Sequence, residues 1–107
     1  MAFDYKIKNI NDLDTPVLVV YPDRVKHNIQ TAIDMVGDVA RLRPHIKTHK
    51  SAEVARLMMD AGITKFKCAT IAEAEMLGIA GAKDVLLAYQ PIRASVRGEG
   101  IGLGRKW

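Results

Sequence analysis

The chain of 107 residues suffices for one domain with a modest core, and its apolar fraction of 49% and charged fraction of 26% are ordinary for a globular protein. Its net charge of +4 is too small for a nucleic-acid-binding surface. No apolar run reaches the roughly 20 residues of a membrane span, the first residues lack a signal-peptide core, and the single cysteine cannot form an internal disulfide. We therefore expect a cytoplasmic protein that binds neither nucleic acid nor membranes.

The first predicted elements are a strand and a helix. The β-branched run at 17–20, which lies between Thr-Pro and Tyr-Pro, predicts a strand. Pro22 suits a first helical turn, and apolar residues recur at helical spacing from 25 to 36. Gly37 then provides a suitable end for this helix.

A second strand is predicted at 39–48, and it carries most of the run Arg-Pro-His-Ile-Lys-Thr-His-Lys at 43–50. Because side chains alternate along a strand, the odd positions of this run would share one face. These positions are Arg43, His45, Lys47 and His49. The opposite face is mostly apolar, which is typical of a strand that packs on helices and lines a site with its polar face. On such a face, neighbouring positive charges would disfavour the ammonium form of Lys47, and Schiff-base chemistry requires such an activated amine.

A second helix and a third strand follow. Ser51 can cap a helix that ends near Gly62, and residues 65–70 are predicted to form the strand. Thr70 and Glu73 have the spacing of a capping box, which predicts another helix directly after that strand.

The third helix is predicted to stop near Gly81, and a fourth strand at 84–90 is nearly all apolar, as expected in a buried parallel strand. Alternating strands and helices with short connections indicate an α/β fold with a parallel sheet, in units compact enough for a (β/α)₈ barrel. Since eight strands close such a barrel, we expect an incomplete one. Residues 93–107 lose the apolar periodicity, and we predict a flexible basic tail there.

Several segments, in chain order, resemble the N-terminal part of D-threonine aldolase and D-serine dehydratase-like enzymes, which belong to the alanine racemase-type, fold type III, pyridoxal-phosphate group. They are Asp14-Thr-Pro-Val-Leu-Val-Val, Asn28, the run at 43–50 and the run from Lys65 to Glu75. The resemblance implies that residues 1–92 are a partial alanine racemase-type barrel whose first strand is the one at 39–48. It places the strand at 17–20 outside the barrel.

The resemblance also implies a role for the central lysine. In that family the lysine of R-P-H-x-K-T-H-K forms the internal aldimine with pyridoxal phosphate, and here this residue is Lys47. His45, His49 and Tyr89 are the other candidates for cofactor binding, although a structural role stays open for each. The two histidines are not expected to share a metal ion, because four residues of strand separate them by about 13 Å. The family uses a divalent metal, whose ligands would lie downstream of this chain.

Two further residues have several readings. Arg43 can pair with a carboxylate, contact the cofactor or serve the fold. Cys68 alternates with Phe66 and is predicted to be a small core residue, since no His and Asp pattern supports a nucleophile.

The implied activity is that of a pyridoxal-phosphate-dependent lyase acting on a D-amino acid. It would be an aldolase that cleaves Cα–Cβ in D-3-hydroxy amino acids, or a dehydratase that eliminates water from D-serine; a homodimer would be in keeping with the family. We expect the chain alone to be inactive and poorly stable, and we interpret 93–107 as a frameshifted terminus. Two alternatives stay open: a non-catalytic pyridoxal-phosphate-binding or homeostasis protein of the same fold, and an inactive remnant or interaction module.

Overall fold

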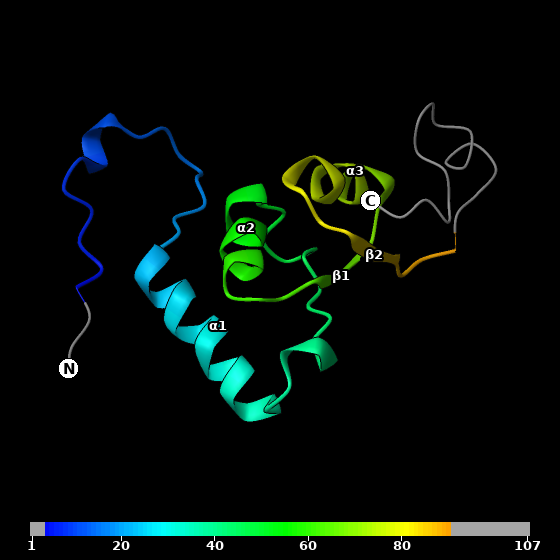
Figure 1. The fold of residues 1–107 in the computed structure, drawn as a ribbon. Helices are drawn as coiled ribbons and strands as arrows, with labels where there is room; N and C mark the ends of the chain where they lie inside the picture. The colour runs from blue at the N-terminus through cyan, green and yellow to red at the C-terminus, as the bar shows by residue number, and fades with distance from the viewer. Residues whose placement is uncertain (1–3, 91–107) are drawn as a thin grey trace.

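The computed structural model describes residues 4–90, which form an α/β arrangement of parallel segments and covering helices (Figure 1). Its elements are α1 (Pro22–Val36), α2 (Ala52–Asp60), β1 (Lys65–Cys68), α3 (Ile71–Ala80), β2 (Asp84–Leu87) and the short 3₁₀ helices η1 (Ile10–Asp12) and η2 (Val39–Arg41). The predicted tail at 93–107, with its proposed frameshift, lies outside the described residues. No helix within the described range is both long enough and apolar enough to cross a membrane.

The two strands pair in parallel and are joined by α3, which confirms the predicted strand–helix–strand crossover. Phe66 lies opposite Val85 in their register. A third parallel segment meets the other side of β1 through a single bridge between His45 and Lys67. The Lys67 N–H donates to the Pro44 carbonyl at 2.9 Å, and the Lys67 carbonyl accepts from the Ile46 N–H at 3.0 Å. Three parallel segments therefore lie side by side.

The strand predicted at 39–48 is wrong in extent, because only one bridge forms. Its first residues make η2 instead, where the Asp38 carboxylate accepts the Ala40 N–H. In a longer parallel ladder, the N–H of residue 44 would donate the next hydrogen bond to β1. This residue is Pro44, which has no N–H, so the ladder cannot extend in that direction. Beyond the bridge, the Ile46 carbonyl accepts from the Lys50 N–H at 2.9 Å and is thus engaged within its own segment.

The strand predicted at 17–20 is also wrong. These four residues are extended but belong to no strand, and all of their side chains are exposed, Leu18 to 67%. Their β-branched composition favours a sheet, yet no strand among the described residues lies beside them. The preceding segment is held to the start of α1 by the Tyr21 hydroxyl, which donates to the Tyr5 carbonyl at 2.8 Å.

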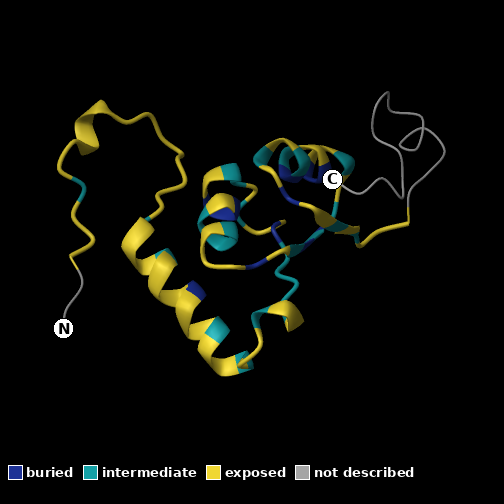
Figure 2. Cartoon of the chain, viewed as in Figure 1, coloured by how far each residue is buried: buried dark blue, intermediate teal, exposed yellow. Residues whose placement is uncertain are grey.

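The core lies on the face of the sheet that α2 and α3 cover. Phe66 and Cys68 of β1 point into it, together with Ile46 and Leu77, and all four side chains are fully buried. Figure 2 shows that burial is concentrated at β1, α2 and α3, whereas α1 and β2 are mostly exposed or only half-buried. The expectation of a buried strand at 84–90 is therefore wrong: β2 ends at Leu87, none of its residues is buried, and Leu86 is 49% exposed, because helices cover only one face of the sheet.

The predicted helix caps are confirmed. The Ser51 hydroxyl accepts the Val54 N–H at 3.2 Å, and the Thr70 hydroxyl accepts the Glu73 N–H at 3.1 Å. Helix α1 ends at Val36 and is followed by Gly37, whose φ of 78° lies in a region that glycine occupies without steric cost. Local sequence thus determines where these helices begin and end.

Candidate functional site

The three parallel segments bring their carboxyl ends to one edge, and Lys47 lies there. Lys47 directly follows Ile46, which is 0% exposed, so the buried residue fixes the point from which the exposed lysine projects. Thr70 follows β1 and Tyr89 follows β2 at the same edge. Active sites of parallel barrels form at this edge.

The chain turns immediately after Ile46, so the predicted strand face of residues 43, 45, 47 and 49 does not form. Lys50 closes the turn: its N–H donates to the Ile46 carbonyl, and its Nζ donates to the Lys47 carbonyl at 2.6 Å. Lys50 has a φ of 49°, a left-handed conformation that is uncommon for a residue with a side chain. Lys47 therefore occupies a turn rather than the middle of a strand.

Both histidines of the run accept hydrogen bonds from the backbone. The Lys47 N–H donates to His45 Nδ1 at 3.2 Å, and the Ser51 N–H donates to His49 Nδ1 at 3.0 Å. His49 Nε2 is buried and has no hydrogen-bond partner among the described residues. Burial lowers the pKa of His49 and so favours its neutral ring.

Glu73 lies beside this edge, and the sequence identifies it only as part of a helix cap. It is 5% exposed, and its carboxylate accepts the Thr70 hydroxyl at 2.8 Å and the Ala69 N–H at 3.2 Å. Burial alone would raise the pKa of Glu73, but these two hydrogen bonds, with the nearby charges of Lys50 and His45, lower it overall. A buried carboxylate thus faces the basic run from α3. The signal was the capping box itself, which follows a strand ending beside that run.

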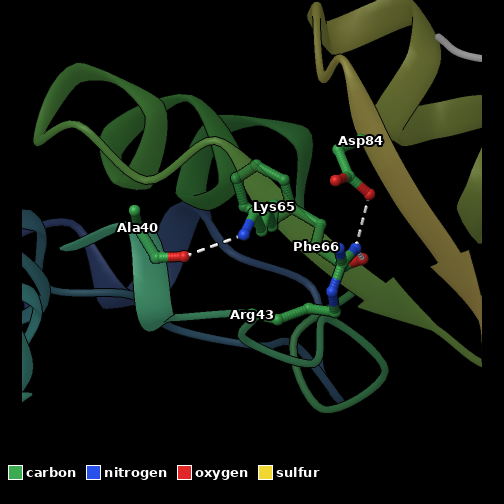
Figure 3. Close-up of polar contacts among 5 residues, drawn as sticks. All are labelled: Ala40, Arg43, Lys65, Phe66 and Asp84. Carbon is green, nitrogen blue, oxygen red and sulfur yellow. Dashed lines mark hydrogen bonds and ion pairs between the residues drawn. The ribbon is translucent and has the colours of Figure 1, made fainter. Parts of the chain in front are cut away.

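Arg43 contacts the first residue of β2, Asp84, and therefore lies near the amino ends of the strands, away from Lys47 (Figure 3). One guanidinium nitrogen, Nη1, is 2.7 Å from the Asp84 carboxylate and 3.1 Å from the Phe66 carbonyl. The hydrogen bond to Asp84 raises the pKa of Arg43. Beside it, Lys65 Nζ donates to the Ala40 carbonyl at 3.0 Å. Of the three readings of Arg43, pairing with a carboxylate is the one that the structure shows.

Cys68 is a core residue, as predicted. Burial and the charge of Glu73 raise the pKa of Cys68 to about 11, which disfavours the thiolate that a nucleophile requires. Tyr89 is 61% exposed just beyond β2. Its proposed contact with a cofactor stays a prediction.

A cavity of about 430 Å³ lies between the N-terminal segment, α1 and the turn that carries Lys47. Its lining includes Thr48 and His49 from the turn and Arg24 and Asn28 from α1, while Lys47 is not among the lining residues. Asn28 was one of the positions that carried the family resemblance. The fold thus brings it close to the basic run.

The exposed amine of Lys47 could hold an aldehyde cofactor covalently, since it projects from the edge where parallel-barrel sites form. No three His, Cys, Asp or Glu side chains within residues 4–90 gather into a group that could hold a metal ion. The Nδ1 lone pairs of His45 and His49 are both engaged by backbone N–H groups.

Comparisons with known proteins agree with this description. A family model described as the N-terminal domain of alanine racemase matches residues 20–97. The chain is 43% identical over 79 residues to D-threo-3-hydroxyaspartate dehydratase of Delftia sp. (strain HT23). The aligned region covers 71% of this chain and 20% of that protein. The chain therefore spans about a fifth of the length of the curated relative that it matches.

Solved structures of that dehydratase match as well. The structure of the enzyme from Delftia sp. HT23 superposes with a TM-score of 0.62 at 41% identity, over 75% of this chain and 21% of the other. A mutant of the dehydratase in the metal-free form gives a TM-score of 0.61 over the same shares of the two chains. These matches confirm the resemblance found in the sequence and the α/β fold, as part of a barrel enzyme. Because the family model covers well over half of its residues, the chain belongs to the alanine racemase N-terminal-domain family.

Proposed function

We propose that this chain forms part of the cofactor-binding barrel of a pyridoxal-phosphate-dependent lyase, with Lys47 as the residue that holds the cofactor covalently. The placement of Lys47 carries the proposal: an exposed amine follows a fully buried residue at the carboxyl edge of three parallel segments. Its relation to a dehydratase at 43% identity supports the same reading.

The chain's own residues would attach and present the cofactor. Pyridoxal phosphate, when bound, supplies the electron sink for breaking a bond next to the amino group of an amino acid. Lys47 Nζ would be the attachment atom and, once released, a base positioned at the substrate Cα. The turn after Ile46 fixes where this amine projects, and Tyr89 lies after β2 at the same edge.

A D-amino acid with a 3-hydroxyl group is the substrate class that we favour. The relative is named for dehydration of D-threo-3-hydroxyaspartate, so its activity favours loss of the 3-hydroxyl over cleavage of Cα–Cβ. Such elimination from 3-hydroxyaspartate yields oxaloacetate and ammonia, whereas aldol cleavage would yield glycine and glyoxylate. The substrate would therefore be a small molecule, not a nucleic acid or a membrane.

The attachment site can be tested directly on the chain. We expect pyridoxal phosphate followed by borohydride reduction to label Lys47 in preference to the other lysines, as read by mass spectrometry of peptides. Lys47→Ala should abolish this preferred labelling, while Lys83→Ala, at an exposed lysine between α3 and β2, should leave it unchanged. Equal labelling of all exposed lysines in folded protein would contradict the proposal.

The reaction can be tested in a chimera in which residues 20–90 of this chain replace the matching segment of the Delftia dehydratase. We expect D-threo-3-hydroxyaspartate to give oxaloacetate and ammonia, and Lys47→Ala in the chimera to stop their release. Glycine and glyoxylate would identify an aldolase instead. Cofactor binding without turnover would favour the non-catalytic pyridoxal-phosphate protein.

A further inference from the structure

The two histidines that flank Lys47 make the same local contact, two residues forward along the chain. His45 Nδ1 accepts the Lys47 N–H at 3.2 Å, and His49 Nδ1 accepts the Ser51 N–H at 3.0 Å. An aspartate or asparagine oxygen makes such a bond in an Asx-turn. Here two imidazole rings do so, one at each end of the turn that carries Lys47.

These bonds fix the protonation pattern of both rings. A backbone N–H is always the donor, so each Nδ1 must present a lone pair, and the neutral ring must carry its hydrogen on Nε2. A protonated ring would point a second N–H at the backbone donor and lose the contact. Burial of His49, which favours its neutral ring, agrees with this pattern.

We propose that His45 and His49 are positioning residues, which hold the turn from 45 to 51 in the conformation that presents Lys47. His45 bonds the amide of Lys47 itself, and His49 bonds the amide of Ser51, where α2 begins. The inference rests on the proposed role of Lys47 as the cofactor-holding residue. It assigns to the histidines a contact with the backbone rather than with the cofactor.

The conformation of Lys50 supports this assignment. Its φ of 49° is uncommon for a residue with a side chain, and such conformations persist where surrounding contacts over-determine them. Bonds from Lys50 to the Ile46 and Lys47 carbonyls close the middle of the turn, and the histidine bonds close its two ends. The turn is thus held throughout by its own side chains and backbone.

A metal site would use the histidines differently. A metal-bound imidazole offers a nitrogen lone pair to the ion, but both Nδ1 lone pairs here accept backbone hydrogens. In a neutral ring the remaining hydrogen would then lie on Nε2, which leaves no lone pair for a metal. His49 Nε2 is buried without a partner among the described residues, and the backbone bond at Nδ1 does not account for that atom. A role in positioning the turn explains why each ring uses Nδ1 to accept a backbone N–H.

The first test needs no cofactor. Long-range ¹H–¹⁵N NMR of the 107-residue chain at alkaline pH, where histidine rings are neutral, should show His45 and His49 as the Nε2–H tautomer. An Nδ1–H tautomer at both positions would overturn the inference, whatever the state of the cofactor site. This measurement uses the unmodified protein, so it does not depend on how any variant folds.

Substitutions then separate the hydrogen bond from simple packing. His45→Ala should speed hydrogen exchange at the Lys47 amide, and His49→Ala that at the Ser51 amide, by about two- to tenfold, the range that one hydrogen bond implies. His45→Asn and His49→Asn should restore slow exchange, because asparagine can accept the same N–H in an Asx-turn. His27→Ala, on the exposed part of α1, should change neither amide.

Labelling of Lys47 provides the link to function. We expect the two alanine variants to lower borohydride-trapped labelling of Lys47 relative to Lys83, and the asparagine variants to recover it. Unchanged exchange in both alanine variants, or asparagine variants as impaired as alanine ones, would overturn the positioning role. If the wild-type chain shows no preferred labelling of Lys47 while the exchange results hold, the proposed function fails and the positioning of the turn stands.

Discussion

Two regions of this chain that carry apolar residues differ in burial. The segment at 17–20 consists of four aliphatic residues, yet all are exposed, whereas Phe66 and Cys68 in β1 alternate with lysines and are completely buried. The strand β1 has a parallel neighbour on each side and two helices over one face, and the segment at 17–20 has no strand beside it within residues 4–90. Apolar content alone therefore does not locate the core, because burial requires a partner surface.

The largest expected effect tests this contrast. Phe66→Ala should lower the free energy of unfolding by about 3–5 kcal/mol, through lost burial and the cavity left behind. Val19→Ala, in the exposed segment, should change it by no more than about 0.5 kcal/mol. Urea unfolding followed by circular dichroism measures both, and loss of any cooperative transition in Phe66→Ala would agree with the larger effect. Equal losses in the two variants would show that the N-terminal segment is as well packed as β1.

A smaller effect is expected at the cap of α3. Thr70→Ala should cost about 1 kcal/mol of unfolding free energy, because the Glu73 N–H loses its acceptor and the carboxylate of Glu73 loses a donor. Thr64→Ala removes a hydroxyl at an exposed position that caps no helix and serves as the control in the same unfolding experiment. If both variants lose the same stability, the cap contributes nothing specific to the packed region.

The smallest effect is expected at the Arg43–Asp84 ion pair. Asp84→Asn should cost about 0.2–1 kcal/mol, because both side chains are partly exposed and water screens their attraction. The loss should shrink as salt is added, which unfolding at low and high ionic strength would show. Asp14→Asn in the N-terminal segment is the control. A loss that does not depend on salt would indicate that Asp84 acts through packing or hydrogen bonding alone.

Much of the fold could be predicted, because its signals are local. Ser51 and Thr70 cap helices through their own hydroxyls, and Gly37 ends α1 with a backbone conformation that its sequence position indicates. The buried alternation of Phe66 and Cys68 follows from strand periodicity once the neighbouring helices are placed. These signals need no knowledge of distant residues.

The extent of the first parallel segment could not be predicted by alternation, because it depends on competition for hydrogen bonds. In a longer ladder the Ala69 N–H would donate to the Ile46 carbonyl. Instead the Ala69 N–H donates to the Glu73 carboxylate, and the Ile46 carbonyl accepts the N–H of Lys50. The cap of one helix thus helps to end a neighbouring strand. This relation appears only when residues from 46 to 73 are considered together.

The candidate site was predicted in part. Lys47 does lie at the carboxyl edge of the parallel segments, as the family-like run indicated. The alternation that placed His45 and His49 on its strand face does not hold, because the chain turns after Ile46. A hydrogen bond from a backbone N–H to an imidazole two residues earlier has no signal in hydrophobic periodicity. The capping box identifies Glu73 as a cap, but the sequence does not show that its carboxylate lies near Lys50 and His45, because more than twenty positions separate them.

The contacts of Arg43 have a consequence for how the parallel segments align. Its guanidinium joins the segment before Pro44 to a carbonyl of β1 and a carboxylate of β2, and the bond to Asp84 spans 41 positions of sequence. A slip of either strand by one residue would turn Asp84 to the opposite face of the sheet or move the Phe66 carbonyl away. The two contacts can therefore coexist in a single alignment, so Arg43 discriminates against mispaired strands during folding even though its ion pair adds little to the final stability.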